Sequence, residues 1–119
     1  MNQHEKINYL EYPAKDFEKT KLFFTSVFNW SFTSYGPDYI AFDDQGVEGG
    51  FFRSENCSTS KNGACLTVFF SKSLHSTLEK IETNKGTIVK PIFSFPGGHR
   101  FHFLDPNGNE FAVWSDKLD

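Results

Sequence analysis

The chain has 119 residues, with 12 Lys and Arg against 15 Asp and Glu, so its formal net charge is −3. That length suits a single domain, 1–119, with a core of its own. No basic run exists to follow a phosphate backbone and no apolar run approaches the roughly 18 residues of a membrane span, so we expect no nucleic acid, no membrane and a cytoplasmic location. Aromatic residues make up 18% of the chain, which favours an aromatic core or pocket wall.

The first half of the chain predicts the element order β-α-β-β-β. Residues 7–12 are rich in strand formers, and Asp16 is a suitable N-cap for a helix whose apolar residues follow helical spacing as far as Asn29. Trp30 is then expected to begin the next strand. Turn residues separate three further strands, which we expect at 30–35, 39–43 and 48–52.

The second half predicts the same order after a polar linker at 54–63. A strand at 64–70 precedes a helix capped by Ser73 and ended by Gly86. The segment 87–95 is extended and contains a proline that suits an edge strand or a bulge. The last hairpin is expected from strands at 99–104 and 110–115.

An internal repeat relates the two halves. The stretches FDDQGVEGGFF and LDPNGNEFAVW share three residues at a constant separation of 62 positions: Asp43 and Asp105, Gly46 and Gly108, Glu48 and Glu110. Because a period this long leaves room for two copies, we expect two similar modules, at 6–53 and 64–116, that pack together around a cavity.

The helix segments PAKDFEKT and LFFTSVFNW and the closing DPNGNEFAVW, in this order of elements, resemble the vicinal oxygen chelate superfamily. This group contains glyoxalase I, bleomycin-resistance proteins and extradiol dioxygenases, and the resemblance spans about residues 6 to 116. It implies an α+β fold in which two βαβββ modules form a curled mixed sheet around a concave cavity. It also implies a small-molecule ligand in that cavity and, since a second chain commonly completes it, a homodimer.

The resemblance also locates the positions that hold a divalent cation in the metal enzymes of the group. Those enzymes use His, Gln or Glu from the first and last strands of each module. Here the positions fall on Tyr9, Gly50 and Ala112, and on Leu66 or, with an alignment shift of one residue, Cys65. Since the donors that such a cation needs are missing at three of the four positions, we expect neither a metal ion nor another cofactor. Whether the chain is an enzyme stays open.

A set of polar and aromatic side chains is expected on the concave face. If Phe103 pairs with Phe111 across the last hairpin, alternation places Arg100, His102, Glu110, Ala112 and Trp114 together, and a shift of one residue would invert this assignment. The residues that we expect to bind ligand are Tyr9, Glu11, Phe52, Arg100, His102, Glu110 and Trp114.

Three explanations account for this set. The first is an ion pair between Glu110 and either Arg100 or His102 that only stabilises the sheet. The second is a binding site in which Arg100 and His102 contact an anionic or carbonyl group above Trp114 and Tyr9. The third is a metal or acid/base centre.

That third explanation would use His102 with Glu11 or Glu48, because histidine titrates near neutral pH. Three functions correspond to these alternatives. We favour a metal-free small-molecule binder similar to the bleomycin-resistance branch. The others are a metal-dependent lyase, isomerase or dioxygenase with a shifted site using Glu11 and His102, and a non-catalytic interaction module.

Overall fold

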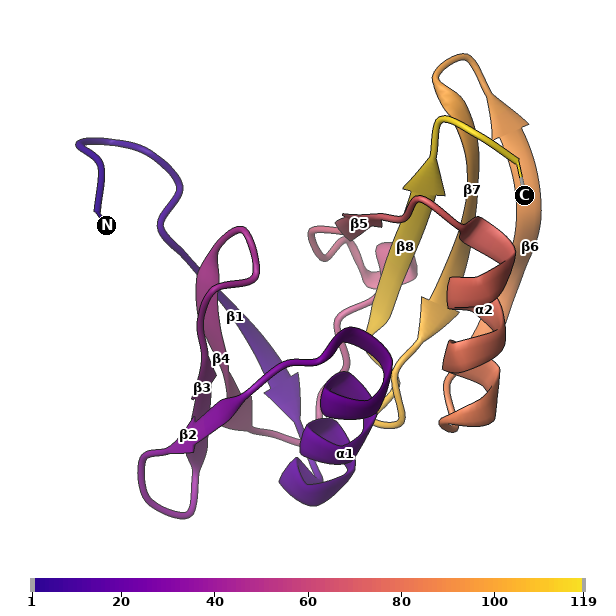
Figure 1. Cartoon of the computed structure of the whole chain (residues 1–119). Coiled ribbons are helices and arrows are strands. Elements are labelled where there is room, and N and C mark those ends of the chain that lie inside the picture. The colour runs from indigo at the N-terminus through magenta and orange to yellow at the C-terminus, as the bar shows by residue number, and fades with distance from the viewer. Residues whose placement is uncertain (1, 119) are drawn as a thin grey trace.

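Two four-stranded sheets and two helices make up the computed structural model, which describes residues 2–118 (Figure 1). Sheet A contains β1 (Tyr9–Ala14), β4 (Glu48–Arg53), β3 (Tyr39–Phe42) and β2 (Phe32–Ser34), in that spatial order. Sheet B contains β5 (Thr67–Phe70), β8 (Glu110–Ser115), β7 (Gly98–Leu104) and β6 (Thr87–Phe95). The helices are α1 (Phe17–Phe28) and α2 (Leu74–Thr83), and a short 3-10 helix spans Ser60–Asn62. The predicted α+β class and the repeated β-α-β-β-β order are confirmed.

The two sheets have the same topology and do not close into a barrel. In each, the first strand of the half pairs in parallel with the last, and the other pairs are antiparallel. Strands β1 and β5 are therefore edges, and no strand pairing joins the sheets within residues 2–118. The hydroxyl groups of Tyr12 and Thr67, 2.7 Å apart, bridge the two edges. The expected curled sheet is thus a pair of open sheets.

Local signals define α1 as the sequence predicts. The Asp16 carboxylate accepts the backbone N–H of Lys19 at 3.1 Å, and Asn29 ends the helix in the left-handed conformation, with φ 62°. Trp30 does not begin the next strand. The backbone N–H of Trp30 donates to the carbonyl of Phe24, and the indole ring stacks on Phe42 with centroids 4.2 Å apart. Trp30 therefore belongs to the core, and β2 starts two residues later.

Helix α2 is shorter than predicted. It ends at Thr83, and Lys85 takes the left-handed conformation before Gly86. A side chain on Gly86 would collide with Ile81, which explains the glycine as a close-approach position and not as the cap itself. Ser73 stands at the N-cap position without a capping hydrogen bond from its side chain.

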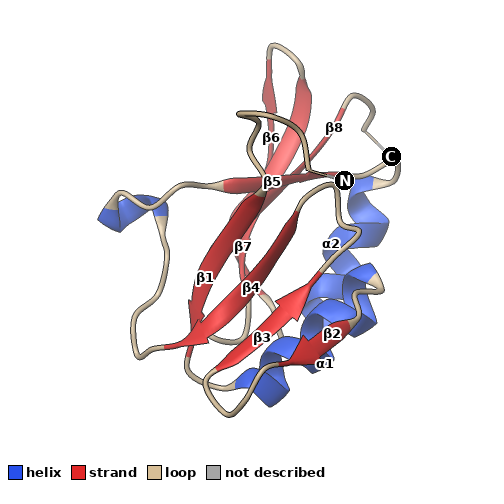
Figure 2. Cartoon of the chain, turned by 90° about the vertical axis from the view of Figure 1, so that its left-hand side faces the viewer, coloured by secondary structure: helices blue, strands red, loops and turns tan. Residues whose placement is uncertain are grey.

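A single aromatic core lies between α1 and both sheets. The fully buried ring of Phe24 lies 5.6 Å from that of Phe51 in sheet A and 5.5 Å from that of Phe111 in sheet B. Phe103 pairs with Phe111 in the β7–β8 ladder, which confirms the predicted register. The helices pack on one face of each sheet, and no helix within residues 2–118 covers the opposite faces (Figure 1 and Figure 2). Figure 2 shows this uncovered side of sheet A in front of the helices.

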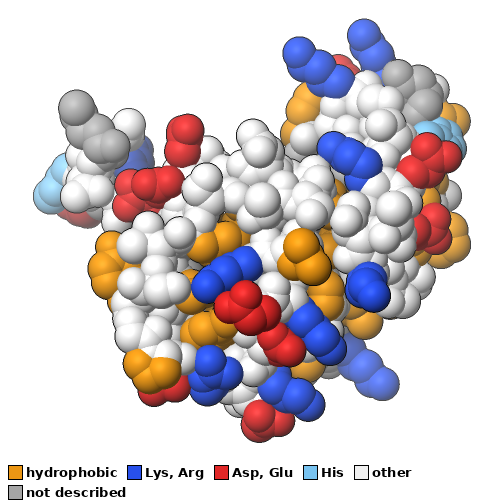
Figure 3. All heavy atoms as spheres, turned by 60° about the horizontal axis from the view of Figure 1, so that its bottom comes forward, with side chains coloured by type: hydrophobic (Ala, Val, Ile, Leu, Met, Phe, Trp, Pro, Cys, Tyr) orange, Lys and Arg blue, Asp and Glu red, His pale blue; other side chains and the backbone are white. Residues whose placement is uncertain are grey.

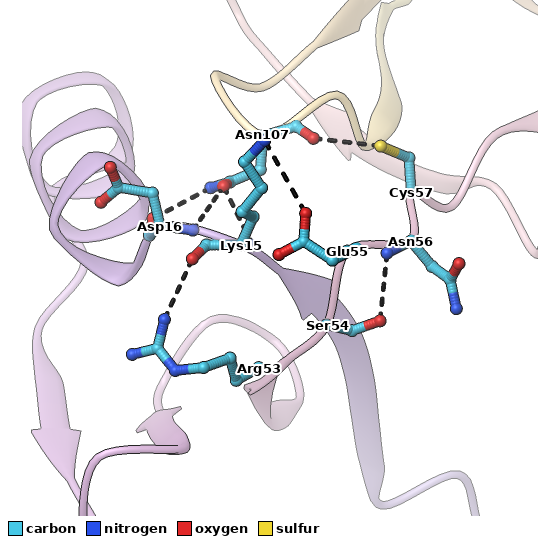
Figure 4. A network of polar contacts seen from close by, with 8 residues as sticks. All are labelled: Lys15, Asp16, Arg53, Ser54, Glu55, Asn56, Cys57 and Asn107. Atoms are coloured by element: carbon cyan, nitrogen blue, oxygen red, sulfur yellow. Dashed lines mark hydrogen bonds and ion pairs between the residues drawn. The ribbon is translucent and has the colours of Figure 1, made fainter.

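The turn between β7 and β8 joins the second module to the first (Figure 4). The side chain of Asn107 accepts the backbone N–H groups of Lys15 and Asp16 and donates to the carbonyl of Asp16 and the hydroxyl of Thr20. Cys57, in the linker, donates to the Asn107 carbonyl. This turn therefore anchors both the start of α1 and the linker.

Candidate functional site

A chain of hydrogen bonds crosses the open face of sheet B, the face turned away from the helices. The Arg100 Nη2 donates to His102 Nε2 at 2.9 Å, and His102 Nδ1 lies 2.8 Å from Glu110 Oε2. The three side chains come from adjacent strands, because β7 carries the first two and β8 carries the third. Alternation places them opposite the buried phenylalanines of the same strands.

The partners fix the tautomer of His102. A guanidinium group has no acceptor, so Nε2 must accept from Arg100 and the ring proton must sit on Nδ1, where it is donated to Glu110. The imidazole is 6% exposed. His102 is therefore held in one orientation between a cation and a carboxylate.

Glu110 is anchored from the other side by the linker. Its Oε1 accepts both the backbone N–H of Ser60, at 2.8 Å, and the Ser60 hydroxyl, at 2.7 Å. Burial alone would raise the pKa of Glu110, but the hydrogen bonds from His102 and Ser60 outweigh it and lower the pKa to about 2. The carboxylate is thus charged throughout the neutral range.

Arg100 is incompletely paired. Its Nε is buried without a hydrogen-bond partner, and the side chain takes part in no ion pair within the described chain, 2–118. A buried donor without an acceptor costs about 1–3 kcal/mol. The guanidinium carbon lies 5.9 Å from the ring centroids of both Phe93 and Phe95. The guanidinium of Arg100 therefore lies among aromatic rings, and its Nε–H group has no acceptor.

A second group of polar side chains occupies the open face of sheet A. The hydroxyl groups of Tyr9 and Tyr39 are 2.7 Å apart, and Tyr39 donates to Glu11 at 2.9 Å. Burial, followed by these two hydrogen bonds, raises the pKa of the Tyr39 phenol above its ordinary value. Phe52, at 38% exposure, is the strand partner of Tyr39. The sequence analysis did not identify Tyr39 as a candidate. Alternation along β3 could have done so, because Tyr39 lies two residues before Ala41 and therefore on the same face of the strand.

The two groups remain separate. Within residues 2–118 no hydrogen bond, ion pair or ring contact joins Tyr9, Glu11 or Phe52 to the Arg100–His102–Glu110 chain. Glu11 and His102 lie on different sheets and have different partners, Tyr39 and Arg100 with Glu110. A site that combines Glu11 with His102 is therefore not assembled within one chain.

The positions that hold a cation in metal enzymes of this architecture do not fit one here. Gly50 and Ala112 offer no donor, and the Tyr39 hydroxyl lies where a side chain on Gly50 would extend. Glu11 and Val68 are the strand partners of these two residues, so sheet A supplies one carboxylate there and sheet B supplies none. No group of three or more His, Cys, Asp or Glu side chains with metal-site geometry occurs in the described part of the chain.

Three hollows in the described part of the chain lie elsewhere. One of about 530 Å³ separates the N-terminal arm from the β3–β4 turn and is lined by exposed polar residues such as Lys6 and Asp43. Another, of about 370 Å³, lies between the β1 and β5 edges on the helix side, with an apolar lining that includes Trp30 and Phe69. A third of about 450 Å³ surrounds Arg53. None of these three is lined by Arg100, His102 or Trp114.

The fold and the open sheet faces together define a protein of paired βαβββ modules, the architecture of glyoxalase-like proteins. The chain belongs to the Glyoxalase/Bleomycin resistance protein/Dioxygenase superfamily, whose family model matches residues 6–113. No match was found among curated protein sequences. Among the described residues, none of the helices has the length and apolar character needed to cross a membrane.

Solved structures share this fold at low sequence identity. A glyoxalase/bleomycin resistance protein/dioxygenase family enzyme from Burkholderia phytofirmans PsJN superposes with a TM-score of 0.78 at 15% identity, over 94% of this chain and 99% of that chain. A glyoxalase-related enzyme from Fulvimarina pelagi gives 0.77 at 13% identity, over 93% and 88%. The fosfomycin resistance protein FosX from Listeria monocytogenes gives 0.73 at 19% identity, over 97% and 94%. These likenesses show a common fold.

Proposed function

We propose that this protein binds a small molecule on the open face of sheet B, without a metal ion to hold the ligand. Family membership supports the binding of a small molecule, and FosX, which shares the fold, is a fosfomycin resistance protein. The Arg100–His102–Glu110 chain gives the face a few polar groups in fixed orientation among aromatic rings. Such a combination is typical of small-molecule sites.

The incomplete pairing of Arg100 is the observation that carries this proposal. The pair of Glu110 with His102, further held by Ser60, already meets the structural explanation. Arg100 is not needed for that pair and makes one bond to the imidazole. The unused donors and the aromatic surroundings favour a ligand over a purely structural ion pair.

A second copy of the chain is expected to complete the site, which makes the working form a homodimer. Exposed apolar side chains lie on the uncovered faces of both sheets: Tyr9 at 41% and Phe52 at 38% in sheet A, Val68 at 40% and Phe70 at 52% in sheet B. Patches of this kind are seldom left in water. A mass of twice 13.6 kDa in light scattering is the expected result, and a monomer at all concentrations would contradict it.

Thermal-shift screening with a diverse compound set tests the function itself. A ligand should raise the melting temperature, and Trp114→Ala should abolish that shift while the protein stays folded. Tyr35→Ala is the matched control, because Tyr35 is an aromatic residue 65% exposed and outside both groups. If no compound stabilises the wild type and a protein partner binds tightly instead, the chain is an interaction module and the proposal fails.

A further inference from the structure

We infer that the ligand is a small organic anion attached to a flat aromatic body, held by Arg100 and Lys90. This inference rests on the proposed function and adds the chemical class of the ligand. It is based on the different hydrogen bonding of the two arginines in the chain, Arg53 and Arg100, and on the position of Lys90 beside Arg100.

Arg53 is an arginine whose guanidinium group has several acceptors in this fold. It pairs with the Asp38 carboxylate at 3.2 Å, donates to the carbonyls of Lys15 and Pro37, and stacks on the ring of Phe17 at 4.4 Å. Its donors are used by groups of its own module. An arginine that serves structure alone is expected to be saturated in this way.

Arg100 also lies over aromatic rings, but it lacks the ion pair and the carbonyl acceptors of Arg53. It donates to one acceptor, His102 Nε2, and its buried Nε has none. The carboxylate of Glu110 lies on the other side of the imidazole ring and bonds to its Nδ1. An incoming carboxylate or phosphate would therefore meet a guanidinium that is already held in place and that has no ion-pair partner within residues 2–118.

Lys90 adds a second cation to the same surface. It lies on β6 as the strand partner of His102, and its Nζ is 5.7 Å from the Phe93 ring centroid, while the Arg100 guanidinium is 5.9 Å from that ring. Neither cation forms an ion pair within residues 2–118. Two like charges beside one ring repel each other, and an anion placed between them would relieve that repulsion.

Aromatic side chains next to the cations provide the surface for a flat ring. Trp114 is the strand partner of Arg100, and its ring centroid lies 5.1 Å from that of Phe70 and 6.2 Å from that of Phe95. Phe70 is 52% exposed, so this aromatic surface is open to a ligand. A planar apolar body can stack there while its acidic group reaches Arg100.

Calorimetry on the 119-residue chain with matched probe pairs tests the inference. The anions are benzoate, 1-naphthoate and phenyl phosphate, each compared with an uncharged analogue: benzamide, 1-naphthamide and phenol. At least one anion should bind about tenfold or more tightly than its neutral partner, and the difference should shrink at high salt. Inorganic phosphate alone should bind more weakly than phenyl phosphate, because it leaves the aromatic surface unused.

Substitutions then assign the cations. Arg100→Met should weaken the anion by about tenfold or more and leave the neutral analogue unchanged, with Arg100→Lys in between, whereas Lys90→Met should give a smaller loss. Lys72→Met, an exposed lysine before α2, should have no effect. Equal binding of anions and neutral analogues by the wild type would overturn the inference and leave the proposed function standing. Binding of no compound in this set or in the screen would overturn both.

Discussion

Asn107 and Asp16 are 91 positions apart in the chain, yet the side-chain oxygen of Asn107 accepts the Asp16 backbone N–H at 2.8 Å. The amide nitrogen of Asn107 returns a bond to the Asp16 carbonyl and another to the Thr20 hydroxyl, at 3.2 and 2.7 Å. One side chain of the second module thus satisfies backbone groups at the start of the helix of the first.

Asn107→Ala is therefore expected to destabilise the protein by about 1–3 kcal/mol, because backbone groups at the start of α1 lose their partners. Urea unfolding measures the change. Asn56→Ala, in the neighbouring linker, is the control and should stay within about 0.5 kcal/mol, since its side chain is exposed. Equal effects of the two substitutions would show that Asn107 does not link the modules.

Because of Asp105, the protein is expected to lose stability as the pH rises from 4 to above 6. Burial, only partly offset by hydrogen bonds from the turn that follows, raises its pKa from 3.8 to about 6. A folded pKa above the unfolded one means that the ionised form is disfavoured in the folded state. Asp105 therefore costs stability above pH 6, by about 3 kcal/mol from the two-unit shift, and this cost disappears as the pH falls toward 4.

Asp105→Asn tests this prediction, because an amide oxygen can still accept the N–H groups of Asn107 and Asn109. The stability of the variant relative to the wild type should be greatest at pH 7 and decrease between pH 6 and pH 4. Guanidinium unfolding across that interval gives the comparison. A difference that does not vary with pH would mean that Asp105 titrates normally.

His102 should show one tautomer in nitrogen NMR. The Arg100 and Glu110 contacts require the proton on Nδ1, so the Nε2 resonance should have the shift of an unprotonated nitrogen. Glu110→Gln removes the carboxylate that holds this proton and should mix the two tautomers. A wild-type spectrum with the proton on Nε2 would exclude the described chain of hydrogen bonds.

Glu110 also has a predicted role in acid stability. Its pKa falls from 4.5 to about 2 in the folded state, so its contribution is fully present above pH 4.5 and is lost as the pH falls through 2. The difference in stability between the wild type and Glu110→Gln should therefore decrease below pH 4.5. Chemical unfolding at pH 6 and pH 3 measures it, and a constant difference would contradict the prediction.

The neighbouring glycines of β4 are predicted to respond differently to alanine. A methyl group on Gly49 would meet the Leu10 backbone carbonyl and the Phe42 ring, neither of which can move freely. On Gly50 it would meet the hydroxyl end of the Tyr39 side chain, whose bonds to Tyr9 and Glu11 would have to shift. Gly49→Ala should therefore cost several kcal/mol in urea unfolding, and Gly50→Ala less, about 1–2 kcal/mol. The opposite order would show that Tyr39 is rigidly fixed.

Much of the fold could be predicted because its signals are local. The cap residues Asp16 and Asn29 act within one helical turn, and the β7–β8 register follows from a short connection with alternating phenylalanines. Trp30 was assigned to a strand because its strand propensity is strong, but packing against Phe42 overrides that propensity.

The candidate site was less predictable because its contacts are distant in sequence. The face shared by Arg100, His102 and Glu110 follows from alternation, but the bond from Ser60 to Glu110 crosses 50 positions and starts in a segment without hydrophobic pattern. Likewise, nothing local connects Tyr39 with Glu11, 28 positions away. How the two open faces lie relative to each other depends on packing through α1, which no sequence period encodes.

The long outer strand of sheet B has features that oppose fibril formation by this phenylalanine-rich chain. Strand β6 is nine residues long, and its pairing with β7 shifts register on both sides of Lys90, with Pro91 following directly. A missing N–H group, a charge and a broken ladder each hinder the addition of a foreign strand. Replacing Lys90 and Pro91 together by valine would be expected to turn this border into a template for aggregation.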